Sequence, residues 1–383
     1  MRILMLNYEF PPLGAGGATS SFNLARNVVR LGHEVDVVTM SFKEVPRHDV
    51  LDGVNVFRVP SLRSRKEVCH THEMVTYVLS GAFQAWALAR RTDYDVCNAH
   101  FIFPTGPIAF GLRRLSGPPY VLTARGSDVP GHNPNRFRLD HQLLQPVWRT
   151  LVRDADAVVA VSEHLKTRIR ANAPEVQVTV IPNGCSPLES DPAEDDAPAA
   201  VRRNGSMRVL MVTRLHEFKG VQYLLEAAAR IGLDLEIDIV GDGPYRKTLE
   251  TQAAELGRPV RFWGWLDRTA PEFRRLYRAS SVFVFPSERE GSPAVLQEAM
   301  SAGLAVIAAD SAGTPEVVGD AGLLVSPKDP KAIADALLHL AAHPQLAEEL
   351  GQKARDRVRR EFDWTVLAGR YVELYARVAR RAS

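Results

Sequence analysis

Two glutamates bracket a short turn in the stretch SEREGSPAVLQEAMSAG, and seven residues separate Glu290 from Glu298. Carboxylates are natural partners for vicinal diols, because each accepts two hydrogen bonds at once. The Gly-Ser-Pro turn predicts a helix with Ser292 as N-cap and Pro293 as first residue. Glu290 then lies in the loop, where it can accept bonds from hydroxyls, and Glu298 lies in the second helical turn, within reach of a ribose. Two surface charges near a helix start are the alternative.

Two cations follow an apolar run in VTRLHEFKG. Arg214 and Lys219 lie just beyond the first expected strand of the second half, at the edge where such sheets bind ligands. There they could hold a diphosphate and stabilise its charge as a bond to it breaks. Two solvated loop charges are the alternative reading.

A glycine turn, PPLGAGGATSS, follows the opening apolar run. A dinucleotide fingerprint would need glycines at 14, 16 and 19, but position 19 is Thr19. The next expected strand, EVDVVTM, also lacks a terminal acidic residue for a ribose. NAD binding is therefore not expected. A phosphate at a helix N-terminus and a tight turn without a ligand both remain open.

The elements that must position these residues alternate between strand and helix patterns. Because the strand runs are apolar on both faces, the pattern indicates parallel sheets covered by helices on both sides. The expected strands of the first half are RILML, EVDVVT, VNVFRVP, DVCNAHF, YVLTARG, DADAVVAVS and QVTVIPN. Those of the second half are MRVLMVTRL, LEIDIVGDGP, VRFWGWL, SSVFVFPS, LAVIAAD and GLLVSP.

The alternation is interrupted once and then restarts, which predicts two doubly wound, Rossmann-like α/β domains. The first covers residues 1–185. Residues 186–206, rich in Pro, Asp, Glu and Ala, are expected to form an exposed linker. The second domain covers 207–362. The amphipathic tail, 363–383, is expected to form a helix that packs back on the first domain.

Size and composition restrict the classes of protein that fit. A chain of 383 residues is comfortable for two domains. Its net charge of +2 gives no signature of nucleic-acid binding. Cys69, Cys97 and Cys185 lie far apart, which predicts unpaired thiols in a reducing cytoplasm and no metal site.

Membrane-spanning segments are not expected, because no run reaches about 18 apolar residues and the first run is too short for a signal peptide. The prediction is a soluble cytoplasmic protein. Arg63, Arg65 and Lys66 precede a partly apolar segment that could contact an anionic membrane at its inner face, as a peripheral protein would. A solvated basic face is an equal alternative.

Glu290 and Glu298 within EGSPAVLQEAMSAG resemble the E-x7-E motif of retaining GT-B glycosyltransferases, most closely family 4, the glycosyl transferases of group 1. PPLGAGG, TRLHEFKG, VGDGP, IPNG and AGTPEVV resemble other segments of that scaffold, so the resemblance covers nearly the whole chain. It implies the GT-B fold, in which two doubly wound domains face a cleft.

The family implies a nucleotide-sugar donor in the second domain. There Glu298 would bind the ribose, Glu290 the transferred sugar, and Arg214 with Lys219 the diphosphate. The implied donor-binding set is Gly16, Gly17, Arg214, Lys219, Glu290, Gly291, Ser292, Pro293, Ala294 and Glu298. No metal and no other cofactor is expected, because the two cations take the place of a metal ion.

Three residues of the first half complete the implied site. His100, in NAHFIFPTG, matches a family histidine near the reacting sugar, which makes it a candidate catalytic residue beside Arg214, Lys219 and Glu290. Asp128, in TARGSDVPG, is similarly placed. Many relatives have His where this chain has Arg125, so the role of this region is open. An arginine there could bind an anionic acceptor or donor sugar.

The resemblance implies transfer of a sugar, with retention, to the hydroxyl of a carbohydrate or lipid-linked acceptor, as in the synthesis of cell-surface polysaccharides or glycolipids. Arg214, Lys219 and a helix N-terminus would absorb charge on the leaving group. The alternatives are a sugar-nucleotide epimerase or a phosphorylase on the same scaffold, or a non-catalytic protein that binds nucleotide sugars.

Overall fold

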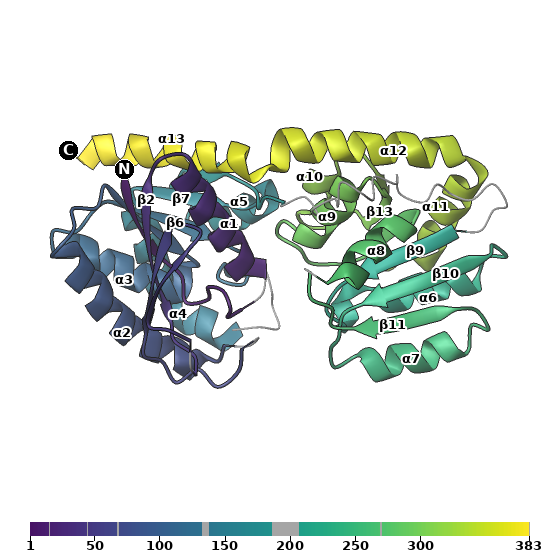
Figure 1. The fold of residues 1–383 in the computed structure, drawn as a ribbon, viewed down its shortest axis with the longest axis horizontal. Coiled ribbons are helices and arrows are strands. Elements are labelled where there is room, and N and C mark those ends of the chain that lie inside the picture. The colour runs from purple at the N-terminus through teal and green to yellow at the C-terminus, as the bar shows by residue number, and fades with distance from the viewer. Residues whose placement is uncertain are drawn as a thin grey trace. The chain divides into compact units, whose positions relative to one another are not determined.

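The structure of the chain is a computed structural model that describes residues 1–14, 16–43, 45–66, 69–131, 138–185, 207–268 and 270–382. Only the backbone is described at 138–143 and 382. The expected linker, 186–206, lies outside the described residues. The chain forms two compact units: Met1–Gly184 with Trp364–Ser383, and Cys185–Asp363 (Figure 1).

The described part of the first unit holds an eight-stranded sheet in the order β3-β4-β2-β1-β5-β6-β7-β8. Its strands are β1 (Arg2–Leu6), β2 (Glu34–Met40), β3 (His48–Leu51), β4 (Val54–Val59), β5 (Val96–His100), β6 (Tyr120–Ala124), β7 (Ala157–Ala160) and β8 (Val178–Val180). All neighbours are parallel except β3 and β4. The order reverses between β1 and β5, and ligands bind doubly wound sheets at the carboxyl edge of such a switch point.

Helices cover both faces of this sheet. They are α1 (Gly16–Arg30), α2 (Thr71–Ala89), α3 (Ile102–Arg114), α4 (Arg138–Asp154), α5 (Glu163–Asn172) and α13 (Trp364–Ala382). Alternate residues of a strand point to opposite faces. Ile3 and Met5 of β1 therefore pack with α1 and α13, whereas Leu4 and Leu6 pack with α2 to α5. The C-terminal helix α13 lies beside α1 and completes one layer of the first unit (Figure 1).

The described part of the second unit holds a six-stranded parallel sheet in the order β11-β10-β9-β12-β13-β14. Its strands are β9 (Met207–Val212), β10 (Leu235–Val240), β11 (Val260–Gly264), β12 (Val282–Phe285), β13 (Ala305–Ala309) and β14 (Leu323–Val325). Here the switch point lies between β9 and β12. The two sheets confirm the predicted α/β class with doubly wound sheets.

Helices again form two layers. They are the short 3-10 turn η1 (Glu217–Lys219), α6 (Val221–Ala229), α7 (Arg246–Ala254), α8 (Pro271–Ala279), α9 (Ala294–Ala302), α10 (Thr314–Val318), α11 (Pro330–Ala342), α12 (Pro344–Arg357) and the π-helical turn η2 (Val358–Phe362). Met207, Val209 and Met211 of β9 pack with α6, α7 and α11. Leu210 and Val212 pack with α8 and α9 on the other face.

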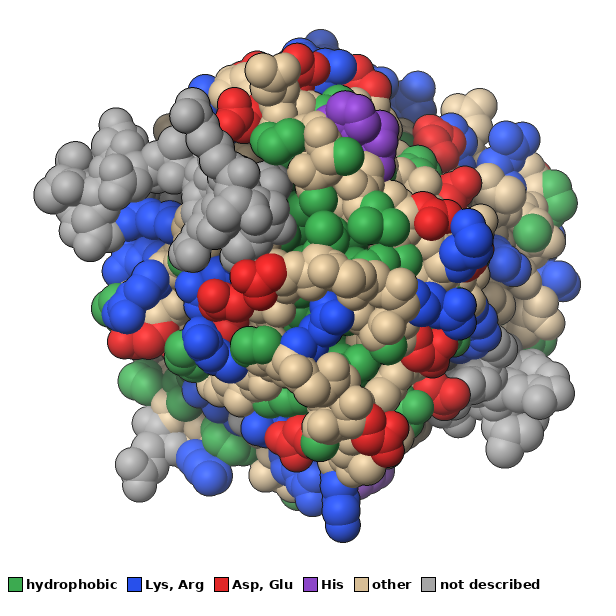
Figure 2. Space-filling model, turned by 90° about the vertical axis from the view of Figure 1, so that its right-hand side faces the viewer, with side chains coloured by type: hydrophobic (Ala, Val, Ile, Leu, Met, Phe, Trp, Pro, Cys, Tyr) green, Lys and Arg blue, Asp and Glu red, His purple; other side chains and the backbone are tan. Residues whose placement is uncertain are grey.

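On the face that Figure 2 shows, basic and acidic side chains are interspersed, in keeping with the net charge of +2. None of the helices within the described residues is long and apolar enough to span a bilayer.

The turn after β1 fixes the start of α1 against the end of β5. A Cβ added to Gly17 would lie 2.8 Å from the ring atom Cζ of Phe101, the residue after β5. A Cβ added to Gly16 would meet nothing within 4 Å. Gly17 therefore allows the close packing of α1 on Phe101, whereas Gly16 faces open space.

We expect Gly17→Ala to destabilise the fold by about 1–3 kcal/mol, because the added methyl group overpacks the contact with Phe101. Gly16→Ala is the matched control and should change stability by less than about 0.5 kcal/mol. Urea unfolding followed by circular dichroism measures both. Equal unfolding midpoints for the two variants would contradict this account of the turn.

Candidate active site

The two loops at the switch point of the second sheet are packed against each other. The loop after β9 carries Arg214 and Lys219, and the loop after β12 carries Glu290. The backbone N–H of Glu288 donates to the carbonyl of Phe218 at 3.0 Å. Gly220 has φ +77°, and an added Cβ would lie 2.5 Å from the carbonyl oxygen of Pro286. Only glycine fits there, so the distance between the two loops is fixed.

Lys219 and Glu290 form an ion pair across these loops. Their side chains are 11% and 16% exposed, so the pair is largely shielded from water. The hydroxyl of Ser287 donates to the same carboxylate oxygen at 2.8 Å. The structure thus brings two predicted site residues together, and each holds the other at the carboxyl edge. A ligand can contact both groups only by sharing or exchanging this pair.

Arg214 is exposed at the same edge and forms no ion pair with any residue that the structure describes. The charge of Arg214 acts on the nearby His216, a residue that the sequence analysis did not single out. Burial lowers the pKa of His216, and the nearby Arg214 and Lys219 lower it further. The imidazole is therefore neutral at pH 7, and Arg214 is the exposed cation of this loop that could meet an anion.

A third loop, after β13, packs against the loop that carries Glu290. The N–H of Gly313 donates to the carbonyl of Glu290 at 2.9 Å. A Cβ added to Gly313 would lie 1.8 Å from the carbonyl oxygen of Gly291. Ser311 Oγ donates to the carbonyl of Glu288 at 2.7 Å. The loop that contains Glu290 and Gly291 is therefore clamped by main-chain contacts on both sides.

The predicted helix start needs a correction. Helix α9 begins at Ala294, and Pro293, with an extended backbone (φ −74°, ψ 110°), takes the N-cap position. Ser292 is therefore not the N-cap, and its Oγ accepts a bond from Gln297 Nε2 at 3.3 Å. The correction moves the start by one residue, because Pro293 keeps an extended ψ. The first N–H groups of α9 still have no partner in the helix's own ladder.

Glu298 lies in the second turn of α9 with only 2% of its side chain exposed. Arg268 Nη2 lies 2.8 Å from Oε1, and the Tyr277 hydroxyl donates to Oε2 at 3.3 Å. Burial raises the pKa of Glu298, whereas Arg268 and Tyr277 oppose the rise. Arg268 is a partner that the sequence analysis missed, although it follows β11 at the same carboxyl edge as Arg214.

His100 ends β5 at the switch point of the first sheet and is fully buried. Arg125 Nη2 lies 2.8 Å from its Nδ1, and Asn98 Nδ2 lies 3.2 Å from its Nε2. A guanidinium can only donate, so Nδ1 must accept. Burial lowers the pKa of His100 well below its usual value, and Arg125 lowers it further. The imidazole is therefore neutral.

Arg125 and Asp128 hold the loop after β6. Arg125 also donates to the side-chain oxygen of Asn183, so its guanidinium bridges two partners within the unit. Asp128 accepts the backbone N–H groups of Ile102, Arg125 and Gly126 at 2.7, 3.0 and 2.8 Å. These bonds give Asp128 a clear positioning role, because they fasten the loop after β6 to the segment after β5.

The predicted site residues thus gather in two sets. Lys219, Glu290 and the start of α9 meet at the switch point of the second sheet, with Arg214 in the same loop as Lys219. Gly17, through Phe101, adjoins the segment of His100 at the switch point of the first sheet, where Arg125 contacts His100. Among the described residues, no group of three or more His, Cys, Asp and Glu side chains could hold a metal ion.

Comparisons with known proteins identify the family of the chain. The model of the family "Glycosyl transferases group 1" matches residues 206–343, and that of "Glycosyltransferase Family 4" matches residues 14–187. The α-maltose-1-phosphate synthase of Mycolicibacterium smegmatis is 30% identical, with 99% of this chain and 100% of that protein covered. An uncharacterised glycosyltransferase of Methanocaldococcus jannaschii is 28% identical, with 98% of both chains covered.

Solved structures support the fold. A sucrose-phosphate synthase from Thermosynechococcus elongatus has a TM-score of 0.82 at 22% identity, with 100% of both chains covered. The Anabaena protein HepE, in complex with UDP and glucose, has a TM-score of 0.72 at 19% identity, with 98% of this chain and 99% of that chain covered. Together with the matches in sequence, they show that the chain belongs to the glycosyl transferases of group 1 and has the GT-B fold.

Proposed function

We propose that this glycosyltransferase moves a sugar from a nucleotide-diphosphate sugar to a hydroxyl acceptor, with retention and without a metal ion. The observation that carries the proposal is the pairing of loops at the switch point of the second sheet. Arg214 and Lys219 follow β9, and Glu290 follows β12, so cations and a carboxylate share one ligand edge. A sugar diphosphate needs both kinds of partner.

The positive groups of the site could stabilise the negative charge of the leaving group in this reaction. When the C1–O bond of the donor breaks, both electrons go to the diphosphate oxygen, which Arg214, Lys219 and the N–H groups of α9 stabilise. The acceptor oxygen then bonds to C1 on the same face, and its proton passes to the departing phosphate. Glu290 orients the sugar through its hydroxyls. In the second unit Glu298, held by Arg268, is the partner proposed for the ribose.

The two cations take the place of a metal ion and of any other cofactor in this proposal. Their charge lies in the loop where the diphosphate would bind, so the leaving group is neutralised without a divalent cation. A UDP-sugar is a reasonable donor to test first, because solved relatives include complexes with UDP and UDP-glucose. The proposed role is in the synthesis of a polysaccharide, glycolipid or related glycoconjugate, and the proposed location is the cytoplasm.

The acceptor is proposed to bind at the first unit, and α2 supplies a reason to expect a lipid-linked acceptor. Val75, Leu79, Phe83 and Trp86 are 56%, 71%, 68% and 40% exposed, and their spacing sets them on one face of the helix. These four residues are called the apolar stripe below. Burying such side chains in a lipid interface is favourable.

Charges around the apolar stripe favour an anionic membrane as its partner. Arg65 and Lys66 are exposed before α2, and Arg90 and Arg91 are exposed after it. Arg90 also lies over the ring of Trp86, 5.7 Å from its centroid. The one acidic side chain of α2, Glu73, is buried. Apolar side chains flanked by cations are typical of helices that lie in the surface of anionic bilayers.

Loss of either cation should slow the chemical step. We expect Arg214→Ala and Lys219→Ala to lower kcat by about 100-fold or more, because each removes charge that stabilises the leaving group. Arg230→Ala is the control, since Arg230 is an exposed cation after α6, away from the carboxyl edge. Transfer assays measure all three variants. Near-normal kcat in Arg214→Ala and Lys219→Ala would contradict the proposed roles.

Donor binding should not depend on a metal ion. A donor at about 100 times its Kd should stabilise the protein by about 2.7 kcal/mol, which appears as a rise in melting temperature. Thermal shift with UDP-, ADP- and GDP-glucose finds the donor base, and the same shift is expected with EDTA present. A shift that appears only with Mg²⁺ or Mn²⁺ would contradict metal independence. The absence of a shift with all three nucleotide sugars would contradict the donor class.

Binding to anionic vesicles should require the apolar stripe. We expect Leu79→Glu and Phe83→Glu to weaken partitioning to phosphatidylglycerol vesicles about tenfold or more, because each inserts a charge where a side chain would enter the lipid. Leu338→Glu is the control, since Leu338 is 42% exposed on α11 of the second unit. Sedimentation with vesicles at low and high salt measures binding. Wild-type protein that stays in the supernatant at low salt would contradict the membrane contact.

A further inference from the structure

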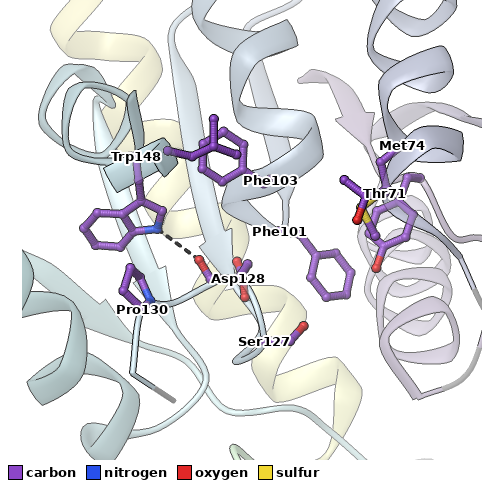
Figure 3. Close-up of a pocket in the computed structure, with 10 residues that line it drawn as sticks. Thr71, Met74, Phe101, Phe103, Ser127, Asp128, Pro130 and Trp148 are labelled. Atoms are coloured by element: carbon purple, nitrogen blue, oxygen red, sulfur yellow. Dashed lines mark hydrogen bonds between the residues drawn. The ribbon is translucent and has the colours of Figure 1, made fainter. Parts of the chain in front are cut away.

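The first unit contains a partly open pocket of about 80 Å³, and none of the proposed donor-binding residues lines it. Aromatic and aliphatic side chains line most of it (Figure 3). The side chains that matter for the argument are Met74, Phe101, Phe103, Asp128, Leu144 and Trp148.

The pocket lies at the ligand edge of the first sheet. Phe101 directly follows His100, the last residue of β5, and Asp128 lies in the loop after β6. Gly17 at the start of α1 packs on the ring of Phe101. The pocket therefore adjoins the switch point between β1 and β5, where a doubly wound sheet binds its ligand.

Two of the polar residues that line the pocket, Asp128 and Trp148, already bond within the protein. The carboxylate of Asp128 accepts three backbone N–H groups. The indole N–H of Trp148 donates to the carbonyl oxygen of Asp128 at 3.0 Å (Figure 3). The rest of the lining is mainly apolar, with the rings of Phe101 and Phe103 and the thioether of Met74, and Tyr8, Thr71 and Ser127 add a few hydroxyl groups. Sugar hydroxyls buried there would find few partners, which is costly, whereas a hydrocarbon would not need them.

Two helices that line the pocket also carry exposed apolar side chains. Met74 lies in α2 immediately before Val75, the first residue of the apolar stripe. On α4, Leu144 lines the pocket and is 40% exposed, and Val147 is 45% exposed. The pocket and the apolar stripe therefore share helix α2, so the pocket lies near the surface proposed to contact lipid.

We propose that this pocket binds the hydrocarbon chain of an amphiphilic acceptor, next to the hydroxyl that receives the sugar. The inference rests on the proposed function, because it names the class of acceptor for the same reaction. It adds that the enzyme recognises the acceptor by an apolar group as well as by its polar head. The largely apolar lining suits an alkyl or prenyl chain.

Titration calorimetry of the full-length protein with n-hexanol, n-octanol and n-decanol tests this assignment without any donor. Affinity should rise about fourfold for each added methylene group, because each buries apolar area in the pocket. Met74→Glu and Leu144→Glu, on two different walls, should each weaken decanol binding about tenfold or more. Leu115→Glu is the control: Leu115 is 66% exposed at the end of α3 and does not line the pocket, so affinity should stay at the wild-type value.

Equal affinity for the three alcohols, or unchanged decanol affinity in both pocket variants, would overturn the assignment. Leu144 is partly exposed, so Leu144→Glu keeps the test valid if Met74→Glu fails to fold. Thermal shift with UDP-, ADP- and GDP-glucose on the same proteins separates the two proposals. Alkanol binding without any donor binding supports the pocket and overturns the proposed function. Donor binding without alkanol binding overturns the pocket alone.

Discussion

A steric constraint at the carboxyl edge of the second sheet determines where the candidate site residues lie. The loops after β9, β12 and β13 pack main chain against main chain, so closely that Gly220 and Gly313 leave no room for a Cβ. Because these contacts are between backbones, the positions of Lys219 and Glu290 do not depend on flexible side chains alone. A short segment of irregular backbone can therefore present charges with the precision that transition-state stabilisation requires.

The charges of the second unit have different environments. Lys219 is paired with Glu290, and Glu298 is paired with Arg268, so these four groups are neutralised within the protein. Arg214 stays exposed. This distribution suits a site that must attract an anion but also remain stable without it. In the proposed function, an incoming diphosphate would contact the exposed Arg214 and share Lys219, while the hydroxyls of its sugar would share Glu290.

Much of this arrangement could be predicted from the sequence, because it depends on local pattern. Apolar runs gave the strands of both sheets, and residues that follow them had to reach the ligand edge. What could not be predicted depends on contacts between distant segments, such as Arg268 with Glu298 and Arg125 with His100. The edge strand β3 and helix α12 were also missed. In α12 the buried residues Ala347, Leu350, Gly351 and Ala354 do have helical spacing, but charged neighbours obscure it.

The central claim is that a sugar diphosphate binds the second unit through the loop after β9. The most direct measurement is a crystal structure of the protein with the nucleotide sugar that raises its melting temperature. The account predicts diphosphate oxygens within hydrogen-bond distance of Arg214 and Lys219, with Glu290 on the hydroxyls of the sugar. A diphosphate bound at another edge, with Arg214 and the Lys219–Glu290 pair untouched, would contradict it.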